Sequence, residues 1–174
     1  MTFRPTALAI HYTATFEDQN PSVAEITRWH KAAGMRTFGY HWYIDRDAKL
    51  FEGRPETEMG AHVRGHNGYT LGIAWAGGCD RATGKDIGVW NITLEQEKQL
   101  IRLIKDVLER HPSITRVIGH KDFVATQCPG LPKGGVAQWW ADVQAREPAA
   151  RPYRTSGGLA GIIARLLAWL GGRT

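Results

Sequence analysis

The sequence predicts an α/β fold in which a mixed central β-sheet is flanked by helices. Three observations support this prediction. Short apolar runs that suit buried strands alternate along the chain with segments of helical periodicity. Two of the helical segments begin with capping signals, and turn residues separate the elements. The 174 residues, of which 43% are hydrophobic and 22% charged, suit one domain with a single core.

The first strand and helix follow from local patterns near the start of the chain. Residues 7–12 (ALAIHY) form a short apolar run that predicts a buried strand. Ser22 and Glu25 fit a capping box that starts a helix. Gly34 fits the C-terminal stop of that helix.

A hairpin and a loop come next. Residues 40–45 (YHWYID) predict a strand, and the turn at residues 46–48 leads into residues 49–51 as its partner. Residues 55–68 are rich in Gly, His and polar residues, and we expect a loop there.

The second half of the main domain predicts two strands and two helices. Residues 71–76 and residues 116–119 are the expected strands. Thr93 fits the capping residue of the longer helix. Residues 136–145 predict the last helix of the domain. The apolar stripe of the longer helix consists of Leu100, Ile101, Ile104, Val107 and Leu108.

Composition changes after Glu147 and divides the chain. We expect a main domain over residues 1–147, a linker rich in Pro and Gly over residues 148–158, and a C-terminal amphipathic helix within residues 159–174. This helix is too short to cross a bilayer, which needs about 20 apolar residues. Its apolar stripe, Trp169 and flanking Arg residues suit contact with an anionic membrane surface. Packing on its own domain or on a second copy is an equal alternative.

Charge and cysteine content limit the class of protein. The net charge of +5 suits a partner such as a cell-wall polymer or a membrane headgroup, and the absence of a dense Lys/Arg run gives no reason to expect nucleic acid. Two Cys are too few for a disulfide framework, although a single Cys79–Cys128 bridge remains open. The N-terminal residues lack the apolar stretch of a signal peptide, so we expect synthesis in the cytoplasm without one.

Three residues suggest a metal site. His11 ends the first strand, His120 follows the strand at residues 116–119, and Cys128 comes eight residues later. Two imidazoles and a thiolate suit zinc, and three protein ligands leave a fourth position for water, as in catalytic sites. Taken as isolated residues, these three give a weak signal, because a lone histidine more often has a structural role and the chain has seven histidines.

Four segments carry a resemblance to a known family. They are AIHYTAT (9–15), FGYHWYIDRDAKLFEGRPETEMGAHV (38–63), HNGYTLGIAWAGG (66–78) and GHKDFVATQCPG (119–130). In this order they resemble the amidase-type phage endolysins and the related peptidoglycan recognition proteins, over about residues 5–145. Members of that family are N-acetylmuramoyl-L-alanine amidases, and some bind peptidoglycan without cutting it.

The resemblance implies an activity and a set of site residues. One Zn²⁺ per chain would be held by His11, His120 and Cys128 in the catalytic domain, residues 1–147. Tyr40 matches a tyrosine that is needed for cleavage. Thr126 stands where phage members usually carry lysine and several catalytic recognition proteins carry threonine. The implied substrate groove is lined by or adjoins His62, Asn67 and Trp42.

Each implied role has a plain structural alternative. Tyr40 is also compatible with a core aromatic in a strand, and His62 with a surface position in a loop. The implied function is a phage endolysin that reaches the cell wall or periplasm from the host cytoplasm and causes lysis. The second hypothesis is a non-catalytic peptidoglycan-binding protein. Such members typically lose a zinc ligand, whereas all three positions and Tyr40 are present here.

Overall fold

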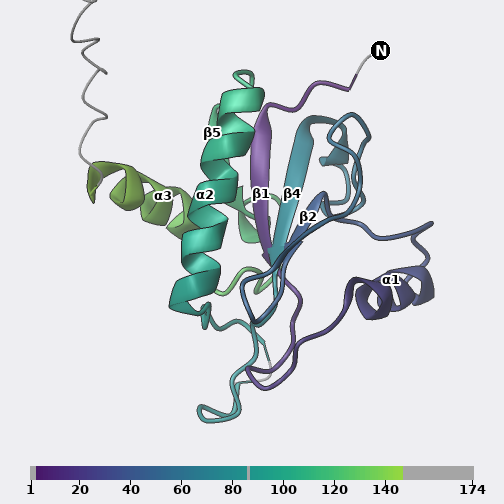
Figure 1. Ribbon diagram of the computed structural model, residues 1–174, viewed down its shortest axis with the longest axis vertical. Helices are drawn as coiled ribbons and strands as arrows, with labels where there is room; N and C mark the ends of the chain where they lie inside the picture. Colours follow the sequence, from purple (N-terminus) through teal and green to yellow (C-terminus); the bar gives the residue numbers. More distant parts are fainter. Residues whose placement is uncertain (1–2, 86, 147–174) are drawn as a thin grey trace, which may run out of the picture. The chain divides into compact units, whose positions relative to one another are not determined.

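The computed structural model describes residues 3–85 and 87–146, and Figure 1 shows how their elements are arranged. Within these residues five strands form one sheet in the order β3-β2-β4-β1-β5. β1 (Ala7–Tyr12) lies between β4 (Thr70–Trp75) and β5 (Arg116–Gly119) and is parallel to both. β2 (Trp42–Ile44) runs parallel to β4 and antiparallel to β3 (Leu50–Glu52). The sheet is mixed, as the sequence predicts.

Three α-helices accompany the sheet in the described residues: α1 (Val23–Ala32), α2 (Leu94–Arg110) and α3 (Gly135–Arg146). Both predicted capping boxes are confirmed. The Ser22 hydroxyl accepts the Glu25 N–H at 3.2 Å, and Thr93 caps α2 in the same way. Two single turns of 3₁₀ helix are also present: Asn67–Tyr69 precedes β4, and His120–Asp122 follows β5.

One face of the sheet packs against α2 and α3. Successive residues of a strand point to opposite faces, so Leu8 and Ile10 of β1 share a face with Ile73 of β4 and Trp42 of β2. This face and the apolar stripe of α2 form the larger apolar cluster, and Figure 1 shows α2 running beside β1. Its helical members include Leu100, Leu103, Ile104, Val107, Val136, Trp140 and Val143.

The opposite face of the sheet carries the small residues and His11. In the strand register, His11 pairs with Ala74, and Ala74 pairs with Tyr43 of β2. Ile26 of α1 packs on this side with Tyr43 and Phe38. The small residues Ala9, Gly72 and Ala74 share this face with His11, and the His62 ring packs directly against Gly72.

A buried amide joins α2 to the sheet edge. Gln96 is fully buried, and its Nε2 donates to the carbonyls of Asp45 at 2.9 Å and Ala76 at 3.0 Å. Its Oε1 accepts the Thr93 N–H at 3.1 Å and the Arg46 guanidinium at 3.2 Å. Every polar atom of this amide therefore has a partner, as a buried polar group requires.

The strand limits differ slightly from the expected ones. β2 begins at Trp42 rather than at Tyr40, although the His41 N–H still donates to the Gly72 carbonyl of β4 at 2.9 Å. The loop predicted over residues 55–68 is present, and its last two residues belong to the turn at Asn67–Tyr69. Cys79 and Cys128, both in the described part of the chain, are not joined by a disulfide.

The chain divides into two units, Met1–Val143 and Gln144–Thr174. The predicted linker at residues 148–158 and the C-terminal helix at residues 159–174 lie outside the described residues. Among the helices that the structure describes, none has both the length and the apolar character that a bilayer crossing requires.

Candidate metal centre

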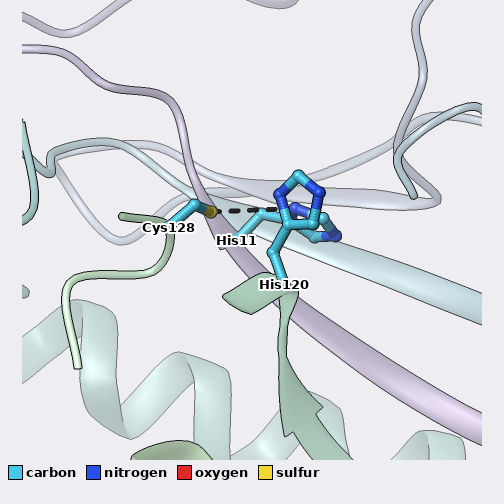
Figure 2. A group of neighbouring side chains, drawn as sticks. All are labelled: His11, His120 and Cys128. Atoms are coloured by element: carbon cyan, nitrogen blue, oxygen red, sulfur yellow. Dashed lines mark hydrogen bonds between the residues drawn. The ribbon is translucent and has the colours of Figure 1, made fainter. Parts of the chain in front are cut away.

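His11, His120 and Cys128 meet at one end of the central strand. β1 supplies His11, the end of β5 leads directly to His120, and the following loop returns Cys128 to the same point. Their potential ligand atoms all lie within 4.8 Å of one another. Figure 2 shows the three side chains directed toward a common space, with His11 beside the sulfur of Cys128.

The spacing and chemistry of these donors fit a zinc ion. The Cys128 Sγ and His11 Nδ1 are 3.8 Å apart. A nitrogen and a sulfur bound to the same tetrahedral zinc are separated by roughly 3.5 Å, given bonds of about 2.0 and 2.3 Å. The remaining ligand, His120, is half-buried, so one side of the cluster is open to solvent. A three-ligand cluster with an open side is the arrangement of catalytic rather than structural zinc sites.

Burial keeps the donors uncharged in the absence of a metal. Burial lowers the pKa of His11 well below 6.5, and the nearby His62 and His120 lower it further. Burial also lowers the pKa of His120. The same cause raises the pKa of the Cys128 thiol to about 12, so metal binding must release its proton. Neutral imidazoles are ready to donate their lone pairs, whereas the thiol becomes a ligand by losing a proton to solvent.

Backbone contacts hold the Cys128 loop against β1. The Cys128 Sγ accepts the Tyr12 N–H at 3.3 Å, and the Cys128 carbonyl accepts the Lys121 N–H at 2.9 Å. The Thr126 Oγ1 accepts the Cys128 N–H at 3.3 Å. Thr126 therefore shapes the turn that presents the thiol, and it lies two residues from it.

The turn that carries His120 is held by a carboxylate. Asp122 Oδ2 accepts the Gly119 N–H at 2.8 Å, and Asp122 Oδ1 accepts the Gly134 N–H at 2.6 Å. One side chain thus links the end of β5 to the segment that precedes α3. This contact gives Asp122 a structural part in placing His120.

Tyr40 lies beside the cluster. Its ring centroid is 5.2 Å from that of His11 and 5.1 Å from that of His30. Burial raises the pKa of the Tyr40 hydroxyl, and the neighbouring Cys128 adds to the effect. The hydroxyl is therefore protonated at neutral pH and can donate a hydrogen bond.

His62 is buried behind His11. The His62 Nδ1 lies 3.1 Å from the His11 Nε2, and the two rings are nearly perpendicular at 86°. Burial lowers the pKa of His62 to about 3, and a weaker interaction with the backbone of Thr70 opposes the shift. Asn67 Oδ1 accepts the N–H groups of His62 and Val63.

Two hollows adjoin the metal cluster at Val124. A hollow of about 380 Å³ is lined by His62, Asn67 and His120, together with Met35, Ala61, Arg64, Gly65 and Val124. A hollow of about 780 Å³ is lined by Thr126 and its neighbours Ile87, Lys121, Asp122, Phe123, Val124, Ala125, Gln127 and Lys133. The predicted groove residues His62 and Asn67 thus border the space beside the ligands.

Trp42 does not lie at the candidate metal centre. Its side chain is 4% exposed and belongs to the cluster under α2, on the face of the sheet opposite His11. It also borders a separate hollow of about 210 Å³ near Glu56. Sequence reasoning overlooked Arg64 and Val124, which line the hollows. Arg64 lies between two matching segments and Val124 lies within the last one, and these positions are the signal that could have indicated them.

Comparison with known proteins identifies the family of this chain. The family described as N-acetylmuramoyl-L-alanine amidase matches residues 2–131. The endolysin of Enterobacteria phage T3 is 33% identical over 135 residues, covering 77% of this chain and 84% of the relative. The endolysin of Escherichia phage T7 is 31% identical over 134 residues, with the same coverage of 77% and 84%.

Solved structures give the same result. The N-acetylmuramoyl-L-alanine amidase LysC from Clostridium intestinale URNW superposes with a TM-score of 0.67 at 30% identity, covering 82% of this chain and 87% of that one. The range that the family model covers, residues 2–131, spans all three potential ligands and Tyr40. The chain therefore belongs to the N-acetylmuramoyl-L-alanine amidase family, with phage endolysins among its relatives.

Proposed function

We propose that this protein is a zinc-dependent N-acetylmuramoyl-L-alanine amidase that hydrolyses peptidoglycan as an endolysin. The observation that carries the proposal is the convergence of His11, His120 and Cys128, with ligand atoms within 4.8 Å of one another, beside two solvent-accessible hollows. The cofactor is one Zn²⁺ per chain. The bond cleaved is the amide between the lactyl group of N-acetylmuramic acid and L-alanine of the stem peptide.

The chemistry needs an electrophilic carbonyl and an activated water. When bound, zinc supplies Lewis acidity to polarise the carbonyl and lowers the pKa of water to about 7. His11, His120 and Cys128 would hold it and leave one position open. Addition of water and loss of the amine give a lactyl carboxylate and a free L-alanine amino group.

Tyr40 and Thr126 would assist at the reacting carbonyl. Tyr40 lies against His11, and its high pKa keeps a proton available for hydrogen bonding to the developing oxyanion. Thr126 borders the larger hollow two residues from Cys128, and its hydroxyl offers a weaker, neutral donor. A lysine at this position would add a charge, so the oxyanion stabilisation expected from Thr126 is smaller than in lysine-containing relatives.

The substrate would occupy the hollows on either side of Val124. Lys121, Lys133 and Arg64 line them, and cations suit the carboxylates of a peptidoglycan stem peptide. His62 and Asn67 lie at the inner edge of the smaller hollow. We therefore propose that peptidoglycan binds in these hollows. Trp42 would support the fold through the apolar cluster under α2 and would not contact the substrate there.

Two measurements on the purified protein test this function together. The protein should contain about one zinc per chain, and it should release N-terminal L-alanine amines from purified peptidoglycan. Appearance of reducing sugar ends without new amines would identify a glycosidase and refute the proposal. Binding of peptidoglycan with no amine release would indicate the non-catalytic alternative.

The membrane role of residues 159–174 is a separate proposal with its own test. A chain truncated after Glu147 should hydrolyse purified wall normally but lyse intact cells less well, if the basic and apolar tail contacts an anionic membrane. If the truncation lowers both activities together, or lowers neither, this role is ruled out. In that scheme the enzyme acts at the cell wall after it reaches the periplasm.

A further inference from the structure

The two nitrogens of His11 face different partners. Nδ1 is directed toward the thiol of Cys128 at 3.8 Å, on the side of the metal cluster. Nε2 is directed toward His62 Nδ1 at 3.1 Å. An imidazole that donates its Nδ1 lone pair to a metal carries its proton on Nε2. His62 Nδ1 is therefore placed to accept that proton in a hydrogen bond.

Glycines define the position of the His62 ring. A Cβ at Gly72 of β4 would come within 2.7 Å of the ring, and a Cβ at Gly60 would come within 2.4 Å of it. Both distances are far shorter than van der Waals contact, so any larger residue at either position would displace the imidazole. The ring lies in a slot whose two walls are backbone, and it is 8% exposed.

Asn67 fixes the backbone that carries the ring. Its Oδ1 accepts the N–H of His62 at 2.9 Å and the N–H of Val63 at 2.8 Å. Because both bonds use the amide oxygen, the side chain is held in one orientation. The His62 backbone is thus anchored from one side while the glycines enclose its ring.

The remaining nitrogen of His62, Nε2, lacks a strong hydrogen-bond partner. His62 Nε2 is buried and makes no well-formed hydrogen bond within the described residues, and the backbone of Thr70 offers the ring only a weak interaction. A buried N–H without a well-formed hydrogen bond destabilises a fold relative to a well-paired one. A residue chosen for packing alone would avoid this penalty, so the hydrogen bond that His62 Nδ1 accepts from His11 Nε2 is the contact that explains a histidine here.

We propose that His62 is a positioning residue that orients His11 for zinc binding, with Asn67, Gly60 and Gly72 holding His62 in place. The inference rests on the proposed zinc-dependent function. A hydrogen bond to the distal nitrogen of a metal-bound histidine fixes the tautomer and the ring plane, and its loss typically weakens metal affinity by about 10- to 100-fold.

Two substitutions of equal shape separate the hydrogen bond from the packing. Asn places its Oδ1 where the histidine carries Nδ1, so His62→Asn keeps an acceptor for His11. His62→Leu has the same branched shape and no acceptor. Zinc affinity of the purified full-length proteins is measured by competition with a chromophoric chelator, and thermal unfolding with chelator present checks that each protein is folded. His66→Gln is the control, since His66 lies in the same loop and contacts Tyr69 rather than His11.

His62→Leu should bind zinc about 10- to 100-fold more weakly than the wild type, whereas His62→Asn should recover most of the affinity and His66→Gln all of it. Equal affinity of the Leu and Asn variants would overturn the inference. A wild-type protein that binds no zinc would instead refute the proposed function.

A second measurement covers the case in which His62→Leu does not fold. In the zinc-loaded wild type, nitrogen-15 NMR of the imidazoles should show the His11 proton on Nε2, protected from exchange and hydrogen-bonded to His62. A His11 proton on Nδ1, or an Nε2 proton that exchanges freely, would overturn the positioning role.

Discussion

The thiol of Cys128 accepts the backbone N–H of Tyr12 at 3.3 Å, across 116 positions of sequence. Tyr12 follows His11, so this bond brings the thiol to the imidazole with which it would share a metal. The contact uses a backbone donor that stays in place whatever side chain residue 12 carries. It allows the role of the sulfur to be tested without removing the loop from the strand.

Replacement of Cys128 by Ser should abolish tight zinc binding and amidase activity. A hydroxyl can still accept the Tyr12 N–H, but it does not become an anion at neutral pH and is a poor zinc ligand. Zinc content by atomic absorption and amine release from purified peptidoglycan measure the two losses. Cys79→Ser is the matched control and should retain its zinc; a Cys128→Ser protein with full zinc content would remove Cys128 from the ligand set.

Replacement of Tyr40 by Phe should leave the zinc content unchanged and lower kcat by about 100- to 1,000-fold, the usual effect of removing an oxyanion donor. The ring contact with His11, 5.2 Å between centroids, survives in phenylalanine, so only the hydroxyl is lost. Amine release under saturating substrate gives kcat. An unchanged kcat would show that Tyr40 has a packing role alone.

The hydroxyl of Thr126 can be tested with two small substitutions. Thr126→Ser keeps the hydroxyl and its bond from the Cys128 N–H, and it should retain most of the rate. Thr126→Val keeps the shape and should lower kcat by about 100-fold through loss of a donor near the reacting carbonyl. Zinc content must be measured in parallel, because a loss of zinc in the Val variant would place Thr126 among the loop contacts instead.

Acidification should destabilise the protein through His41. Burial lowers the pKa of His41 to about 4, while its ordinary value is 6.5. Below pH 6.5, His41 binds a proton in the unfolded chain but stays neutral in the folded chain. The stability present above pH 6.5 is therefore lost as pH falls toward 4. The slope contributed by one such group is at most about 1.4 kcal/mol per pH unit.

The comparison with His41→Gln isolates this contribution. In the wild type, His41 Nε2 lies 3.0 Å from the Glu58 carbonyl and its Nδ1 accepts the Gly72 N–H, which fixes the neutral form. Chemical unfolding at several pH values between 4 and 7 should give a shallower slope for the Gln variant. Parallel curves for the two proteins would contradict the assignment to His41.

Gln96→Glu should lower the free energy of unfolding by about 3 kcal/mol or more. The substitution preserves shape but replaces the Nε2 donor, which bonds two carbonyls at 2.9 and 3.0 Å, with an oxygen that repels them. Burial of the new carboxylate adds a further penalty. The free energy of unfolding in urea measures the loss. Lys98→Gln, on the exposed side of α2, serves as the control and should change little.

Local sequence patterns determine most of this fold. The capping boxes at Ser22 and Thr93 and the apolar runs of β1 and β4 depend on neighbouring residues alone. The capping boxes and β1 are found where the patterns place them, and β4 begins and ends one residue earlier than predicted. The start of β2 was less predictable, because the pairing of His41 with Gly72 does not extend the regular strand back to Tyr40.

The side-chain environment of the site depends on register, which local patterns do not encode. Trp42 and His11 lie on opposite faces because β2 and β1 pair with β4 in a particular alignment, and a shift of one residue would reverse this. The burial of His62 likewise depends on Gly72, which belongs to another element. The ligand trio was easier to anticipate because each member lies within its own matching segment.

The position of β1 sets an order of events during synthesis. The first strand of the chain pairs with β4 and β5, which leave the ribosome much later. β1 can therefore form its sheet hydrogen bonds only after these two strands have been synthesised. A nascent chain that ends before residue 128 would lack a proposed ligand as well as the loop that carries it. Under the proposed function, activity would then appear only when nearly the whole domain has been made, so an interrupted translation product would be inactive.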